Sequence, residues 1–141
     1  MSRIRSIKIR NQVAERAHGC CEYCMAQALY SHDYFSVDHI ISILLGGSDL
    51  LENLAHICQT CNNHKYIFIE ALDPVTGLLA PLFNPRLSKW TEHFKWDETF
   101  TIVIGHTPTG RATVEKLHLN REGLINLREV LYSVKNTRLS I

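Results

Sequence analysis

Four of the five cysteines in this sequence form two pairs, and each pair has two residues between its members. The pairs are Cys21 with Cys24 and Cys58 with Cys61, and Cys20 directly precedes the first pair. Two cysteines at this spacing can face one ion from a tight turn, so two such turns supply the four thiolates of a closed, tetrahedral zinc site. We predict a structural zinc ion held by Cys21, Cys24, Cys58 and Cys61, with Cys20 outside the ligand set.

A thiol–disulfide oxidoreductase would use the same cysteines. That class is typified by one CxxC motif in a strand–helix–strand setting, whereas this chain has two motifs without that setting. The sequence therefore favours metal binding over redox chemistry. Zinc in a small module contributes on the order of 10 kcal/mol of apparent binding energy, which couples metal binding to folding.

The chain has 141 residues, enough for one domain or for a compact core with an appendage. Its net charge of +1 hides a basic N-terminus and an acidic middle, since no Lys or Arg lies between Arg16 and Lys65. Basic segments can bind phosphate and acidic ones can bind cations. No apolar run approaches the roughly 20 residues of a membrane span, and the N-terminus lacks the apolar region of a secretory signal. We expect a cytoplasmic protein without a membrane partner.

Periodicity and turn residues predict the elements around the cysteines. We expect a helix over residues 7–18, strands over 35–40 and 54–57 with a loop at 46–49 between them, and a helix over 62–71. That helix must end before the turn sequence Asp73-Pro74-Val75-Thr76-Gly77. The predicted order is strand, loop, strand, helix.

The C-terminal half predicts a hairpin of residues 94–96 and 100–104, followed by two helices. Thr107-Pro108 is a typical helix start, and Asn120 is the expected cap of the last helix. The apolar stripe of that helix consists of Leu124, Leu127, Leu131 and Val134. We expect residues 1–73 to form the core with its N-terminal helix, and residues 74–141 to pack on it as an extension.

Between and after the cysteine pairs, polar residues follow a recognisable order: Asp38-His39-Ile40-Ile41, Gly46-Gly47, Asn53-Leu54, Asn62 and Lys65. With the cysteines, this arrangement resembles the HNH endonuclease family over roughly residues 13–66. Asn62 stands where a His is commoner, which makes this the HNN variant, and the tail segment Leu82–Arg86 is similar to an extension of small bacterial HNH proteins. The resemblance implies an α+β fold: a ββα-metal (His-Me finger) core stapled by the four-cysteine zinc site, with an N-terminal helix and a C-terminal hairpin and helix extension.

The chemistry of phosphodiester hydrolysis accounts for these residue types. His39 is suited to take a proton from water, because histidine changes protonation near neutral pH. Asp38 offers a hard oxygen ligand for Mg²⁺ or Mn²⁺. The resemblance implies that Asn62 completes the site of this catalytic cation and that Asn53 holds the loop and orients His39. Successive strand residues face opposite ways, so the strand must end or distort near Asp38 if both side chains serve one site.

Two other histidines are weaker candidates. Helix geometry turns His64 about 200° from Asn62, so we expect it to face away from the site. His56 is expected to be an ordinary strand residue.

The predicted function is a metal-dependent endonuclease that cuts DNA, with RNA as an open alternative substrate. Phosphate contacts are expected from basic side chains, and the candidates are Arg3, Arg5, Lys8, Arg10, Lys65, Arg86 and Lys89. Trp90 and Trp96 are expected to pack in the core. The main alternative is a zinc-stapled nucleic-acid-binding module that does not cut, or that serves inside a larger assembly. The joint presence of Asp38, His39, Asn53 and Asn62 favours the nuclease.

Overall fold

The computed structural model describes residues 4–134. These form four α-helices and three two-stranded antiparallel sheets, so the predicted α+β class is confirmed. The helices are α1 (Ile7–Arg16), α2 (Gln59–Lys65), α3 (Pro108–Leu117) and α4 (Glu122–Ser133). The strands are β1 (Phe35–His39), β2 (Leu54–Cys58), β3 (Glu70–Leu72), β4 (Leu79–Pro81), β5 (Phe94–Trp96) and β6 (Val103–Gly105).

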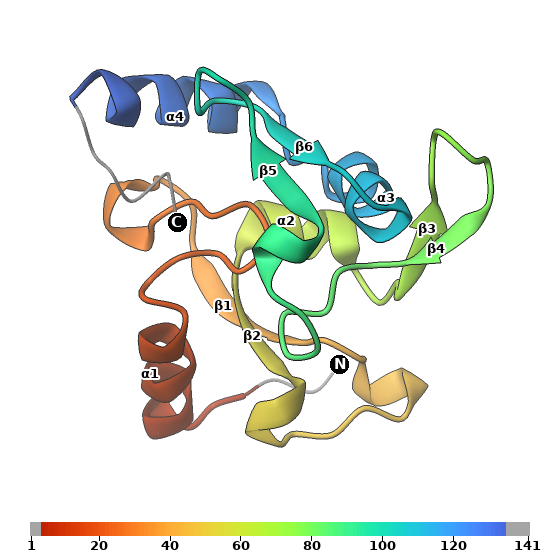
Figure 1. The fold of residues 1–141 in the computed structure, drawn as a ribbon. Helices are drawn as coiled ribbons and strands as arrows, with labels where there is room; N and C mark the ends of the chain where they lie inside the picture. The colour runs from red at the N-terminus through yellow and green to blue at the C-terminus, as the bar shows by residue number, and fades with distance from the viewer. Residues whose placement is uncertain (1–3, 135–141) are drawn as a thin grey trace.

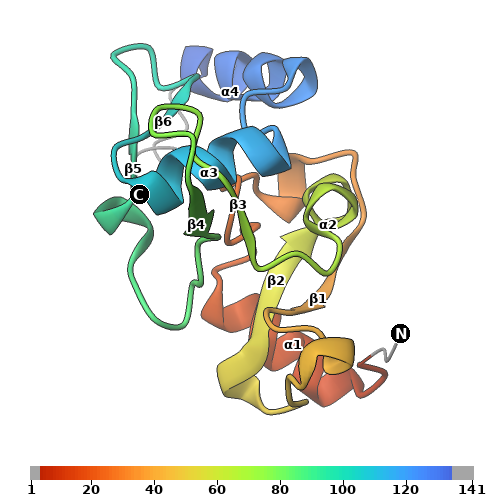
Figure 2. The ribbon, with the colours of Figure 1, turned by 90° about the vertical axis from the view of Figure 1, so that its right-hand side faces the viewer.

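The helices and the β1–β2 hairpin are arranged along the molecule from α1 to α4. Figures 1 and 2 both show α1 beside this hairpin at one end and α3 with α4 at the other, while α2 lies between the hairpin and α3. β1 pairs with β2 from Phe35 opposite Cys58 to His39 opposite Leu54. This register brings the last residues of β1 to the point where β2 begins.

α1 and α3 start as predicted, whereas α1 ends at Arg16, two residues before its predicted end. The Ser6 side chain accepts a hydrogen bond from the Ile9 backbone N–H, and His18 and Gly19 end the first helix in left-handed conformations. Thr107 caps α3 by accepting from the Gly110 N–H at 2.9 Å, with Pro108 in the first helical position.

The predicted boundaries of two further helices are wrong. The helix expected over 62–71 begins earlier, at Gln59, and stops at Lys65, because Tyr66 has a φ of 51°. Residues 70–72 then pair as β3 with β4, and the intervening turn is held by Asp73, which accepts from the Val75 N–H and the Thr76 hydroxyl. The expected cap at Asn120 is also wrong: Arg121 is the N-cap residue of α4, and Asn120 instead bonds both backbone groups of Val103 in β6.

One hydrophobic cluster contains residues from both halves of the chain. Tyr23, Ile57 and the paired cysteines share it with tail residues such as Phe83, Trp90 and Leu124. Trp90 also donates from Nε1 to the backbone oxygen of Tyr23 at 3.0 Å, which places Trp90 in the core as expected. The division at residue 73 stays a prediction. Among residues 4–134, no helix combines the length and apolar character needed to cross a membrane.

Candidate metal centre and catalytic cleft

The four predicted zinc ligands meet in one buried cluster. Cys21 and Cys24 come from the turn after α1, Cys58 ends β2, and Cys61 lies in α2. Their sulfur atoms lie within 4.8 Å of one another, and each residue is at most 1% exposed. Cys20 lies outside the cluster, as predicted.

The geometry of this cluster fits zinc. A zinc–sulfur bond of about 2.3 Å in a tetrahedron places sulfur atoms about 3.8 Å apart, and the Cys24 and Cys58 sulfurs are separated by 3.8 Å. That separation is too long for a disulfide bond. Burial raises the pKa of the Cys21 thiol well above its ordinary value, so a thiolate there needs a cation beside it. Zinc supplies that charge, and the cluster is therefore a four-cysteine metal site able to bind it.

A cationic side chain from the tail faces the same sulfurs. Arg121 donates from Nη1 to the Cys61 sulfur at 3.5 Å and from Nη2 to the Cys58 sulfur at 3.5 Å. With zinc bound, a guanidinium here would offset the surplus negative charge of four thiolates on one divalent ion. This contact was not predicted, because nothing in the spacing of the sequence relates Arg121 to the cysteines.

A cleft of about 530 Å³ opens beside β1 and α2. Asp38 and His39 line it from the end of β1, and Asn62 lines it from α2. β1 stays paired with β2 through Asp38 and ends at His39, and both consecutive residues line the cleft at the strand's end. Tyr66 and Ser42 are among the other residues that line it. The structure thus brings together three of the four residues predicted to be catalytic.

Asp38 is the most enclosed group of this cleft. It is 6% exposed, its Oδ2 lies 3.0 Å from Lys65 Nζ, and it accepts a hydrogen bond from the Tyr23 hydroxyl at 3.4 Å. Burial raises the pKa of the Asp38 carboxyl, and the nearby Lys65 ammonium opposes that rise. Lys65 also donates to the Ile40 backbone oxygen at 3.1 Å. Tyr23 was not predicted to belong to the site.

His39 contacts a carboxylate from the following loop. Its Nε2 lies 2.7 Å from Asp49 Oδ1, and the His39 side chain is 9% exposed whereas that of Asp49 is 62% exposed. Asp49 was not predicted as a site residue. Its place two residues after the Gly46-Gly47 pair, within the loop between the strands, was the only signal available in the sequence.

Asn53 holds the loop between β1 and β2, although it does not line the cleft itself. Its Oδ1 accepts from the Ile41 N–H at 3.0 Å, and its Nδ2 donates to the backbone oxygens of Ile41 at 2.9 Å and Ser48 at 2.8 Å. One amide therefore bonds the chain two residues after His39 and one residue before Asp49.

Asn62 is suited to receive a ligand. Its side chain is half-buried at the cleft and makes no hydrogen bond to any other residue of the part of the chain described. The amide oxygen of Asn62 and the carboxylate of Asp38 are hard oxygen donors of the kind Mg²⁺ and Mn²⁺ prefer. His64 does not line this cleft and lies against His118, with ring centroids 4.5 Å apart, as expected of a residue that faces away from Asn62. His56 is a buried residue of β2, as predicted.

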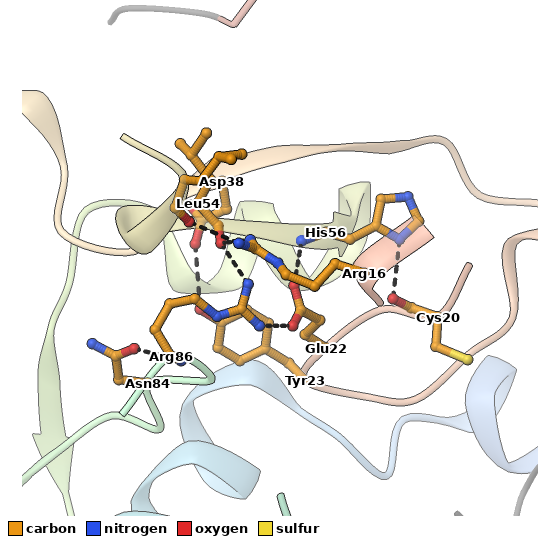
Figure 3. Close-up of polar contacts among 10 residues, drawn as sticks. Arg16, Cys20, Glu22, Tyr23, Asp38, Leu54, His56, Asn84 and Arg86 are labelled. Atoms are coloured by element: carbon orange, nitrogen blue, oxygen red, sulfur yellow. Dashed lines mark hydrogen bonds and ion pairs between the residues drawn. The ribbon is translucent and has the colours of Figure 1, made fainter. Parts of the chain in front are cut away.

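The predicted phosphate-binding side chains are found in different settings. Arg5, Lys8, Arg10 and Lys89 are exposed, while Arg3 lies outside the described residues. Lys65 is 2% exposed in its pair with Asp38. Arg86 forms an ion pair with Glu22 and donates to the Leu54 backbone oxygen, which Arg16 also contacts, as Figure 3 shows. In this structure Lys65 and Arg86 therefore bond protein groups, and their role toward phosphate stays a prediction.

The fold and the site define a small α+β protein with a four-cysteine metal centre next to a polar cleft. Residues 21–66 match the family model of the HNH endonuclease, which confirms the resemblance inferred from the motifs for that segment. The match begins at Cys21 and ends one residue beyond Lys65, so it spans the four cysteines and the cleft residues. Searches of curated proteins and of solved structures found no match to the chain.

Proposed function

We propose that this protein is a metal-dependent endonuclease that hydrolyses phosphodiester bonds of DNA at the cleft of Asp38, His39 and Asn62. One observation carries the proposal: an acid, a histidine and an amide lie at a single cleft within the segment that matches the HNH endonuclease model. In this proposal β1, β2 and α2 form a ββα-metal core, and zinc at the four cysteines has a structural role.

The residues of the cleft divide the work of hydrolysis. Asp38 and Asn62 would hold a divalent cation such as Mg²⁺ or Mn²⁺, which when bound offsets phosphate charge and stabilises the departing 3′ oxygen. His39 accepts the proton of the attacking water as general base. Lys65 and Tyr23 hold the Asp38 carboxylate from the protein side, 3.0 Å and 3.4 Å away. Asn53 fixes the loop that follows His39 by bonding the backbone of Ile41 and Ser48.

The basic residues of α1 suggest where the DNA backbone runs. A second hollow between α1 and β1 is lined by Arg10 and shares Val37 with the cleft. Lys8 is exposed on the same helix, and Arg5 is exposed two residues before the helix begins. Phosphates beyond the scissile bond can therefore meet these cations, which position DNA without reading its sequence. Such contacts make binding weaken steeply with salt.

The test is cleavage of a supercoiled plasmid by zinc-loaded protein, with and without added Mg²⁺ or Mn²⁺. Wild type is compared with His39→Ala and with His32→Ala, a matched change at an exposed histidine. We expect cutting only with added cation, a loss of about 10²- to 10⁴-fold in His39→Ala, and wild-type rates in His32→Ala. DNA binding without cutting by folded wild type would favour the binding module. The Asp38–Lys65 ion pair is consistent with that alternative, because Lys65 occupies the carboxylate that would otherwise bind a cation. Cleavage of a matched RNA would extend the substrate class.

A further inference from the structure

The loop between β1 and β2 supplies His39 with a carboxylate partner. We propose that Asp49 is a positioning residue that fixes the orientation and tautomer of His39, an inference that rests on the proposed function. The contact is 2.7 Å long, from Asp49 Oδ1 to His39 Nε2, which is the length of a charge-assisted hydrogen bond. No other hydrogen bond of the His39 ring occurs within residues 4–134.

This contact selects which ring nitrogen acts as the base. An ionised carboxylate can only accept hydrogen bonds, so Nε2 must carry the hydrogen when it faces Asp49. In the neutral ring the other nitrogen, Nδ1, then has the lone pair. Asp49 therefore makes Nδ1 the nitrogen that receives a proton from water.

The backbone around Asp49 makes this more than a chance surface pair. Asn53 Nδ2 bonds the oxygens of Ile41 and Ser48, so the chain segments adjoining His39 and Asp49 are tied to one side chain. The Gly47 N–H donates to the Ser42 oxygen at 2.9 Å, which closes the loop a second time. Exposed ion pairs on flexible side chains add little stability, but here the backbone fixes the approach of the carboxylate to the ring.

The contact also serves the hydrolytic step. As water attacks, its oxygen forms a bond to phosphorus, its proton moves to His39 Nδ1, and the bond from phosphorus to the 3′ oxygen breaks. The 3′ oxygen then takes a proton from solvent. His39 becomes a cation with a hydrogen on each nitrogen, and the negative charge of Asp49 stabilises it while Asp49 stays ionised, as the aspartate does in serine-protease triads. The His39 proton returns to solvent before the next turnover.

The test combines kinetics with a measurement that does not need activity. Asp49→Asn removes the charge with nearly the same shape, Asp49→Glu keeps the charge, and Glu52→Gln is a matched change at an exposed acid of the same loop region. In Asp49→Asn we expect kcat to fall about 10- to 100-fold with KM changed less than about threefold, because Asp49 acts through His39. The loss is smaller than the roughly 10⁴-fold effect of a buried triad aspartate, since Asp49 is largely exposed. Asp49→Glu should recover part of the rate, and Glu52→Gln should match wild type.

Nitrogen NMR of the zinc-loaded protein without DNA or added cation reads the tautomer directly, and His39→Ala identifies the His39 signals. We expect the tautomer with hydrogen on Nε2 in wild type and in Glu52→Gln, and loss of that single tautomer in Asp49→Asn. An unchanged tautomer and unchanged kcat in Asp49→Asn would overturn the proposal. If wild type cuts no nucleic acid, the proposed function fails, and the NMR comparison still decides whether Asp49 sets the state of His39.

Discussion

Gly47 occupies a position where no side chain fits. A β-carbon at this residue would lie 1.7 Å from the Ile41 backbone oxygen and 2.8 Å from Asn53 Nδ2. Both are atoms of the hydrogen bonds that hold the loop beside His39. Backbone cannot move aside as a flexible side chain can, so any larger residue must displace the loop.

We predict that Gly47→Ala impairs cleavage more than folding. The protein should still bind one zinc ion, because the cysteines lie outside this loop, but its cleavage rate should fall at least about 10-fold, since small misplacements of catalytic groups are costly. Gly123→Ala is the control: a β-carbon there meets nothing within 4 Å, so this variant should cut at the wild-type rate. Wild-type cleavage by Gly47→Ala would contradict this role of the loop.

Side-chain partners were the part of the site least accessible from sequence. Motif order indicated Asp38, His39, Asn53 and Asn62, because their order and spacing relative to the cysteines resemble the HNH pattern. Tyr23, Asp49 and Arg121 lack such a pattern. Their contacts depend on how distant segments pack, as when Arg121 reaches the sulfurs of Cys58 and Cys61, and periodicity carries no information on that.

The helix and strand boundaries likewise were predictable where adjacent residues set them and not where distant segments did. α1 begins where its apolar periodicity predicted, and α3 begins where Thr107 and Pro108 predicted, since a helix start is set by adjacent residues. The end of α2 was wrong because Tyr66 adopts a positive φ and residues 70–72 pair with a strand from farther along the chain. Tertiary pairing overrode the local helical pattern there.

The metal centre joins the turn after α1, β2 and α2, so its loss should loosen all three. We predict that Cys58→Ser loses stoichiometric zinc and lowers the melting temperature, because a buried thiolate ligand is removed from a site that contributes to folding energy. Cys20→Ser is the control, since Cys20 is also buried but lies outside the cluster. Zinc content and thermal unfolding measure both. Equal zinc loss in the two variants would contradict the assigned ligand set.

An ion pair joins Asp73, in the turn between β3 and β4, to Arg111 of α3. Arg111 donates from Nε and Nη2 to the two oxygens of Asp73, each at 2.8 Å. These hydrogen bonds hold the pKa of the Asp73 carboxyl well below its usual range. Since the folded pKa is the lower one, the unfolded chain binds more protons in acid, and the contribution of Asp73 is lost as the pH falls below about 4.

We predict a pH-dependent stability difference between wild type and Asp73→Asn. Wild type should unfold at a higher urea concentration than Asp73→Asn near neutral pH. This gap between the two unfolding midpoints should shrink as the pH falls through the range of ordinary aspartate titration. Zinc release in acid affects both proteins, so their difference isolates Asp73. Glu98→Gln, at an exposed acid, should show little difference from wild type at any pH. A gap between wild type and Asp73→Asn that stays constant across this range would contradict the contribution of the ion pair.

The whole molecule supports one cleft from parts that are distant in sequence. The tail contributes Arg121 to the metal centre, Trp90 to the backbone of Tyr23, and Arg86 to the Glu22 contact shown in Figure 3. Tyr23 in turn contacts Asp38 at the cleft. Residues beyond the segment that matches the HNH endonuclease model therefore contact both the four-cysteine cluster and a residue that bonds Asp38 in the cleft.

A single catalytic site at this cleft is tested most directly by the cleavage rates of His39→Ala, Asn62→Ala and the double variant under saturating Mg²⁺. Groups that act as a unit are strongly non-additive, so we expect each single variant to lose at least about 10-fold and the double variant to be no slower than the slower single one within about threefold. All three proteins should first show wild-type zinc content and a cooperative unfolding transition. Losses that multiply in the double variant, or an Asn62→Ala protein that cuts at the wild-type rate, would contradict a single catalytic site at this cleft.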